Sequence, residues 1–193
     1  MFNNVIETYQ DILLAVRQHI PEAVLVGGCL RDTFYGVEVK DLDFVVPLAQ
    51  HNRALYPLTP QSAWLQEIWP NKTFEYCVLG DERHGVQEEM EGVEGEHPLQ
   101  DVIKSTDDTV NFIIVTDIPA YTNQFPDSIS KLVFDGETIH YANEWMVGHN
   151  TTTVFYRPDI IQARLEKLQR KYPDWVFQRD RVEEEQQELA IEW

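Results

Sequence analysis

Apolar residues recur every three or four positions over 5–20: Val5, Ile6, Tyr9, Ile12, Leu13, Val16 and Ile20. This spacing places them on one side of an α-helix, and Pro21 ends the pattern because proline cannot continue a helix. Two further stretches, 61–69 and 159–172, have helical spacing as well. We expect a helix in each of the three.

Short apolar runs predict strands at 24–26, 42–46, 74–79 and 109–115. A hairpin is predicted where two apolar runs, Lys131 to Phe134 and Thr138 to Tyr141, flank the dipeptide Asp135-Gly136. Asp-Gly favours a two-residue hairpin turn. These elements indicate an α+β fold: a mixed sheet of about five strands, with helices packed on one face and a further C-terminal helix.

The chain has 193 residues, and 43% of them are hydrophobic, which is enough to fill the core of one domain. We expect a main domain over 1–156, with 157–193 forming a C-terminal helix and an acidic tail that pack on it or extend it. No apolar run of membrane-spanning length occurs, and the first residues lack the features of a signal peptide. We therefore expect a cytoplasmic protein without a membrane partner.

The formal net charge is −18, so a large nucleic acid is not a favoured partner. The charge is uneven, since 81–108 holds ten acidic residues against two bases and 157–182 holds seven bases against four acids. The glutamate- and glycine-rich segment 80–98 is expected to be a mobile excursion or a loop ordered by a partner. The bases of the last predicted helix suit contact with a nucleotide or a short acceptor, but a solvated, salt-bridged helix face is the favoured interpretation.

Most candidate residues for ligand and metal binding lie within the stretch 24–46. A strand enters Gly27-Gly28, whose lack of side chains allows a tight turn and close approach of a ligand. The N–H groups that follow would lie at a helix N-terminus and favour phosphate, and Gly36 suits the end of that helix. Asp41 and Asp43 are two apart on a predicted strand, so both carboxylates face the same way and suit Mg²⁺.

This stretch resembles the head-domain signature of the nucleotidyltransferase superfamily, which has a DNA polymerase β-like fold. It is most similar to the poly(A) polymerase and tRNA CCA-adding branch. The matching residues are Gly27, Gly28, Arg31, Asp32, Gly36, Asp41 and Asp43. The resemblance implies a nucleotidyltransferase-like fold, an NTP substrate, Mg²⁺ or Mn²⁺ as cofactor, and catalytic, metal-binding roles for Asp41 and Asp43. It also implies a nucleotide-binding role for the two glycines and for the basic Lys40 beside the acids.

Arg31 has two interpretations of similar weight: it contacts phosphate, or it forms an ion pair with Asp32 that braces the turn. A third carboxylate is often found in the superfamily on the strand beside the two acids. Here the segment TDDTVNFIIV is similar to the RDFTIN segment of the CCA-adding branch, with Asp107 and Asn111 in matching places. Asp107 is the expected third metal ligand, with Asp108 as its alternative and Asn111 as a nucleotide-binding residue. A site with two carboxylates, or a weakened one, also remains open.

The chain has no convincing copy of the E-D-x-x-R helix that selects the base in CCA-adding enzymes. It looks more like the small stand-alone nucleotidyltransferases of bacteriophages and mobile elements, in which an F-P-x-S-I-S-like segment, here 125–130, precedes a D-G hairpin. Two function classes follow. One is a metal-dependent nucleotidyltransferase that moves an NMP onto a hydroxyl of an unknown acceptor, such as a small molecule, a protein or an RNA end. The other is a catalytically weakened binding protein of the same fold with an acidic surface.

Overall fold

The structure is a computed structural model that describes residues 1–51, 58–77 and 98–180. The predicted loop over 80–98 lies outside the described residues except for Pro98, and so does most of the predicted acidic tail. No helix in the described ranges is long and apolar enough to cross a membrane.

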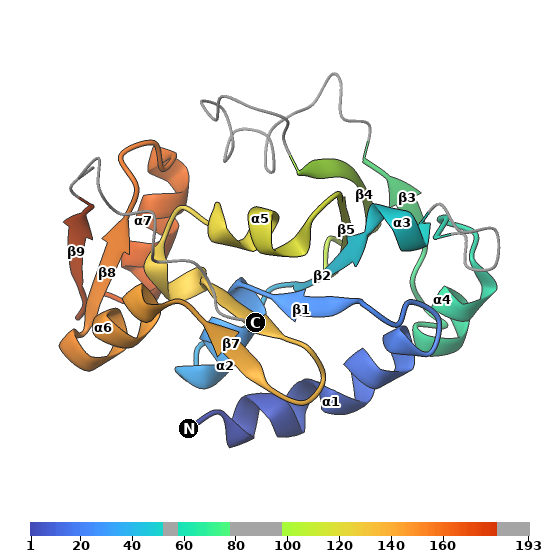
Figure 1. Cartoon of the computed structure of the whole chain (residues 1–193), viewed down its shortest axis with the longest axis horizontal. Helices are drawn as coiled ribbons and strands as arrows, with labels where there is room; N and C mark the ends of the chain where they lie inside the picture. Colours follow the sequence, from blue (N-terminus) through green and yellow to red (C-terminus); the bar gives the residue numbers. More distant parts are fainter. Residues whose placement is uncertain (52–57, 78–97, 181–193) are drawn as a thin grey trace.

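A mixed sheet forms the centre of the molecule (Figure 1). Its seven described strands follow the order β3-β4-β5-β2-β1-β6-β7. Their bounds are β1 Val24–Val26, β2 Leu42–Pro47, β3 Phe74–Tyr76, β4 Leu99–Ser105, β5 Val110–Val115, β6 Leu132–Phe134 and β7 Ile139–Tyr141. All neighbouring pairs are antiparallel except β2 and β5, which run parallel. The α+β prediction with a mixed sheet is confirmed, and β2 lies at the centre.

The sequence-based prediction missed three strands. β4 joins β3 to β5, but its sequence LQDVIKS mixes polar and apolar residues without a continuous apolar run. The other two, β8 Thr153–Tyr156 and β9 Val176–Arg179, form a small parallel sheet of their own. Strand pairing rather than local pattern defines these elements, which is why a single sequence indicates them poorly.

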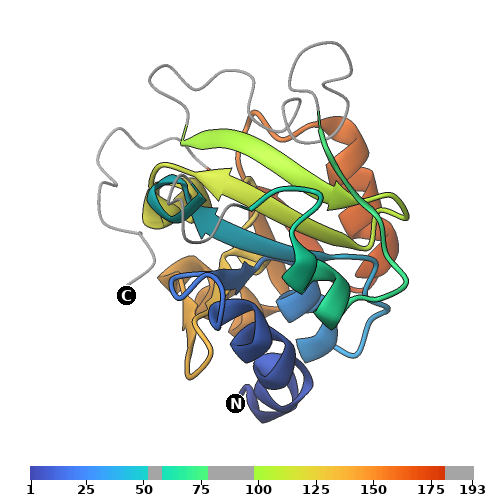
Figure 2. The same ribbon diagram turned by 90° about the vertical axis from the view of Figure 1, so that its right-hand side faces the viewer.

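Helices cover both faces of the large sheet, although most lie on one. The helices are α1 Asn3–Arg17, α2 Gly28–Phe34, α3 Leu48–His51, α4 Ala63–Ile68, α5 Ile118–Asn123, α6 Asn143–Thr151 and α7 Gln162–Lys171. α1, α2 and α4 gather on one side, where Leu13, Leu30 and Leu65 join the larger apolar core (Figures 1 and 2). The short helix α5 lies on the opposite face, over a smaller core that includes Val45 and Ile113.

The periodic segments became helices with shifted ends. α1 buries Val5, Tyr9, Leu13 and Val16 along one stripe, as predicted, but it ends at Arg17, before Ile20. The predicted C-terminal helix is α7, which begins three residues later than expected. It stands beside β8 and β9 at one end of the molecule (Figure 1). The division of the chain at 156 stays a prediction.

Candidate functional site

Asp43 lies on the central strand, on the face of the sheet that α5 covers. Its neighbours in register are Val26 on β1 and Asn111 on β5. Side chains alternate between faces along a strand, and Val45 and Ile113 belong to the core beneath α5. Asp43 and Asn111 therefore project to that same side. The Asn111 amide Nδ2 donates a hydrogen bond to Asp43 Oδ1 over 2.8 Å.

The glycine turn directly precedes α2, as the sequence predicted. Gly27 has φ 71°, in the left-handed region that glycine adopts without strain, and its N–H donates to the Leu132 carbonyl over 3.0 Å. A Cβ atom at Gly27 would lie 3.4 Å from the ring of Phe125. This is an ordinary van der Waals distance, so it is the positive φ that favours glycine at this position.

A small pocket of about 70 Å³ brings these residues together. Its polar lining consists of Gly27, Gly28, Asp43, Gln124 and Arg164. Its apolar lining consists of Val26, Ile113, Tyr121, Phe125 and Pro126. The two predicted glycines and one predicted carboxylate therefore share a pocket with residues from α5 and α7.

Gln124 contributes a polar atom that lacks a partner. Its Oε1 is fully buried and accepts no hydrogen bond from any described residue. A buried acceptor without a partner costs about 1–3 kcal/mol, so such atoms in a pocket favour a ligand that donates to them.

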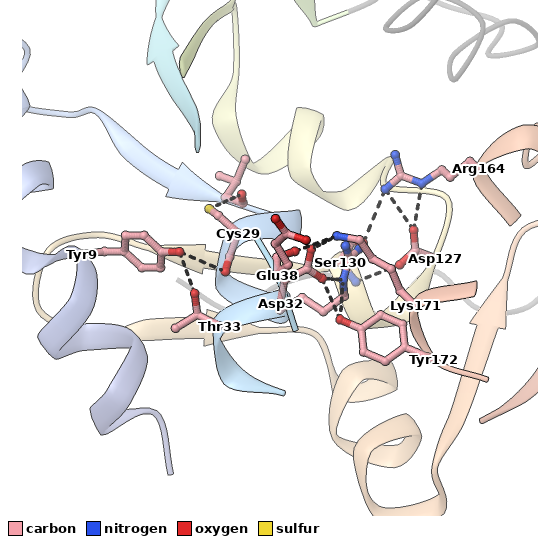
Figure 3. Close-up of polar contacts among 12 residues, drawn as sticks. Tyr9, Cys29, Asp32, Thr33, Glu38, Asp127, Ser130, Arg164, Lys171 and Tyr172 are labelled. Atoms are coloured by element: carbon pink, nitrogen blue, oxygen red, sulfur yellow. Dashed lines mark hydrogen bonds and ion pairs between the residues drawn. The ribbon is translucent and has the colours of Figure 1, made fainter. Parts of the chain in front are cut away.

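Arg164, on α7, is a site residue that the sequence analysis did not single out. It is held by Asp127, whose Oδ2 accepts from Nε over 3.0 Å, and it also donates to Ser130 Oγ over 3.4 Å (Figure 3). Burial alone would raise the pKa of Asp127, but the charges of Arg164 and Arg31 outweigh burial and hold the pKa below its ordinary value. The carboxylate is thus ionised and fixes the arginine at the pocket. In the sequence Arg164 was one of seven bases in its region, with no local signal to separate it.

Arg31 and Asp32 form the ion pair that was one of the two predicted alternatives. Arg31 Nε lies 2.6 Å from Asp32 Oδ1, and both side chains are buried. Asp32 also accepts from Tyr172 and Lys171, so the pair ties α2 to the end of α7 (Figure 3). Burial would raise the pKa of Asp32, yet Arg31 and these partners lower it. A contact of Arg31 with phosphate remains a prediction, and the described contacts of its guanidinium are with protein groups.

Asp41 lies one residue before β2, so only Asp43 of the two acids is within the strand. Lys40 lies 3.8 Å from Asp41, and both are at least partly exposed. The pKa of Lys167 on α7 is lowered by burial and by the charges of Lys171, Lys40 and Arg31, while Asp41 raises it. Asp41 is thus close to Lys40 and within electrostatic range of Lys167.

Asp107 does not join the two acids. Its carboxylate accepts from Lys72 Nζ over 2.6 Å, from Ser105 and from Thr109, and these bonds, led by that from Lys72, lower its pKa. Asp108, the alternative, lies 3.0 Å from Lys104 with its side chain 61% exposed. Within the described ranges no group of three or more His, Cys, Asp or Glu residues is placed to hold a metal. The expected trio of Asp41, Asp43 and Asp107 is therefore not assembled, because the turn before β5 directs Asp107 toward Lys72.

Comparisons with known proteins add little. No family model matches the chain, and no curated protein matches it. Among solved structures, one that is similar is described as a tRNA-processing enzyme (apo form I), with 17% identity and a TM-score of 0.44. The match covers 78% of this chain but 37% of that one, so this chain spans well under two thirds of that enzyme's length. We draw no functional conclusion from a likeness at this level.

Proposed function

We propose that the protein is a metal-dependent nucleotidyltransferase that transfers an NMP from an NTP to a hydroxyl group of an acceptor. The observation that carries the proposal is the pocket in which Gly27, Gly28 and Asp43 meet Arg164. Three of these residues belong to the motif that resembles the nucleotidyltransferase signature, and the fourth is a cation that suits phosphate.

The residues fit a divalent metal with hard oxygen ligands. Asp41 and Asp43 are two positions apart, and Mg²⁺ typically takes one or two carboxylates and completes its shell with water and substrate phosphate. Such a metal would supply charge neutralisation at the phosphates and activate the attacking hydroxyl. Asn111 would hold the Asp43 carboxylate in one orientation through its 2.8 Å bond. The protein's part is mainly positioning and electrostatic stabilisation.

The size of the pocket bears on how a nucleotide would bind. A volume of about 70 Å³ is far below the roughly 300–1,000 Å³ typical of pockets that enclose a ligand. It suits one compact group, such as a phosphate, with the rest of the nucleotide on the adjoining surface. The acceptor is a small molecule, a protein or an RNA end, and a large nucleic acid is disfavoured by the net charge of −18.

Isothermal titration calorimetry with each NTP and Mg²⁺ or Mn²⁺ tests the proposal. We expect wild type to bind an NTP only with metal, and the double variant Asp41→Asn/Asp43→Asn to lose that binding. Asp11→Asn/Asp174→Asn is the matched control, since it makes the same charge change at two exposed residues outside the pocket. Incubation with α-labelled NTP and candidate acceptors then tests transfer. Absence of NTP binding by wild type, with or without metal, would refute the proposal.

A second candidate is a catalytically weakened protein of the same fold that binds partners through its acidic surface. The observation that favours it is that Asp107 pairs with Lys72, while the strand position beside Asp43 holds the neutral Asn111. A site with two carboxylates holds a second metal poorly. This candidate predicts that NTP binds without transfer to any acceptor, or that NTP does not bind at all.

A further inference from the structure

α7 carries cations along the side of the molecule that holds the two acids. Arg164 lines the pocket with Asp43, and Lys167 lies within electrostatic reach of Asp41. These contacts occur in a chain whose net charge is −18, so the local charge differs in sign from the surroundings. Two of the bases on α7, Arg164 and Lys167, thus lie near the acids rather than on a side that faces solvent alone.

The two cations pair with the two acids in reverse order along the chain, Arg164 with Asp43 and Lys167 with Asp41. Arg164 and Lys167 are three positions apart, which on a helix is one turn and a rise of roughly 4.5 Å. Asp41 and Asp43 are two positions apart, which along an extended chain is roughly 6.6 Å. The helix therefore presents one base to each acid, with Arg164 at Asp43 and Lys167 at Asp41.

The basic side chains near Asp41 and Asp43 outnumber the carboxylates that pair with them among the described residues. Asp32 already pairs with Arg31 and Lys171, and Asp127 pairs with Arg164. Lys167 makes no hydrogen bond or ion pair with any residue of the described ranges.

A metal on the two acids would leave that positive charge available. Carboxylates that coordinate a divalent cation no longer compensate nearby bases, so Lys167 would then favour an anion. Arg164, whose charge Asp127 balances, lines the pocket as a hydrogen-bond donor. Arginine suits this task because its planar guanidinium donates more than one hydrogen bond to phosphate, and Asp127 fixes its orientation. Lysine acts as a movable point charge on the next turn.

We propose that α7 binds the polyphosphate chain of the nucleotide, with Arg164 contacting the phosphate in the pocket and Lys167 contacting the next phosphate along the helix. This inference rests on the proposed function and assigns the substrate's phosphates to a helix outside the glycine and aspartate motif. Arg164 is then a substrate-binding residue, and Asp127 is the positioning residue that holds it.

Calorimetry with inorganic tripolyphosphate in the presence of Mg²⁺ tests this inference apart from any transfer. We expect Arg164→Gln and Lys167→Gln each to weaken tripolyphosphate binding about 10- to 100-fold, the range for loss of a charged hydrogen bond. Arg170→Gln is the matched control: it removes the same charge from the same helix, at an exposed residue outside the pocket, and should change affinity less than about twofold. In metal-free buffer, Asp41→Asn/Asp43→Asn should bind tripolyphosphate at least as tightly as wild type does, because the two acids then no longer compensate the bases.

The Lys167→Gln variant is expected to fold normally, because Lys167 is exposed and the substitution breaks no described hydrogen bond or ion pair. A loss of binding in this variant can therefore be assigned to the missing charge. The inference is overturned if wild type does not bind tripolyphosphate, or if both α7 variants bind it as tightly as Arg170→Gln does. It is also overturned, with the proposed function intact, if a metal–NTP complex binds all three variants equally. If tripolyphosphate binding depends on α7 but no metal–NTP complex binds, the phosphate site stands and the nucleotidyltransferase proposal fails.

Discussion

Replacing Asp127 by Asn tests how strongly the buried carboxylate holds the site together. Asp127 is 1% exposed and accepts from the Ser130 N–H over 2.9 Å and from two nitrogens of Arg164 over 3.0 Å each. An Asn side chain keeps the shape and the bond from Ser130. It replaces the other oxygen by an NH₂ group, which cannot accept from Arg164, and it removes the charge opposite Arg164 and Arg31.

The expected loss of stability follows from these contacts. A hydrogen bond to a charged group contributes about 1.5–3 kcal/mol, and breaking a buried ion pair on one side costs about 3–5 kcal/mol. Arg164 retains 20% exposure of its side chain and turns partly to water after the change, so we take the lower end. We expect Asp127→Asn to lower the free energy of unfolding by about 3 kcal/mol, equivalent to a drop in Tm of roughly 10 °C for a chain of this size.

Urea unfolding followed by tryptophan fluorescence measures this loss, because five tryptophans report on the fold. The matched control is Asp159→Asn, which removes a carboxylate from an exposed pair with Arg157 and should cost less than about 1 kcal/mol. An unchanged slope with urea would show that the loss comes from the folded state. The reasoning is refuted if Asp127→Asn costs no more than Asp159→Asn does.

Three further predictions concern the fold. Gly148→Ala should lower the free energy of unfolding by about 1–3 kcal/mol, because a Cβ atom there would lie 2.5 Å from the Thr153 carbonyl oxygen; urea unfolding checks it, and unchanged stability would contradict it. Burial would raise the pKa of Asp32 and of Asp127, but paired bases outweigh it and lower the pKa of each, so both favour the folded state above about pH 5. Stability should fall as the pH drops below about 4 toward the folded-state pKa, and a urea midpoint that rises in acid would contradict this. Burial raises the pKa of the Cys29 thiol, which is 1% exposed. A thiol reagent should therefore modify Cys29 in urea but not in the folded protein, and mass spectrometry of the modified protein checks this.

The sequence predicted those parts of the fold whose signal is local. The runs that became β1, β2 and β5 are apolar except for Asp43 and Asn111, because both faces of these strands are largely buried. β4 lacked such a run, since its place in the sheet depends on pairing with strands on either side. Helices on one face were expected from amphipathic patterns, and the short α5 on the other face has too few residues for a clear period.

In the candidate site, too, the pocket residues that the sequence predicted lie within one local motif. Gly27, Gly28 and Asp43 lie within one motif, and the structure places all three in one pocket. Arg164 comes from a helix far along the chain, so its place at the pocket depends on tertiary packing. Asp107 was assigned by likeness to a family segment, but its carboxylate bonds with Lys72, a neighbour that this likeness did not include.

Residues 125–130 contact both the glycine turn of the motif at 24–46 and helix α7. Phe125 packs against the glycine turn, 3.4 Å from the position that a Cβ atom would take there. Two positions on, Asp127 pairs with Arg164, and Ser130 accepts a hydrogen bond from the same arginine. The two ends of this short segment therefore hold the two halves of the pocket. A change within it should move the pocket's cation relative to the acids. If the proposed function holds, nucleotide affinity would then fall even where the altered residue touches no ligand.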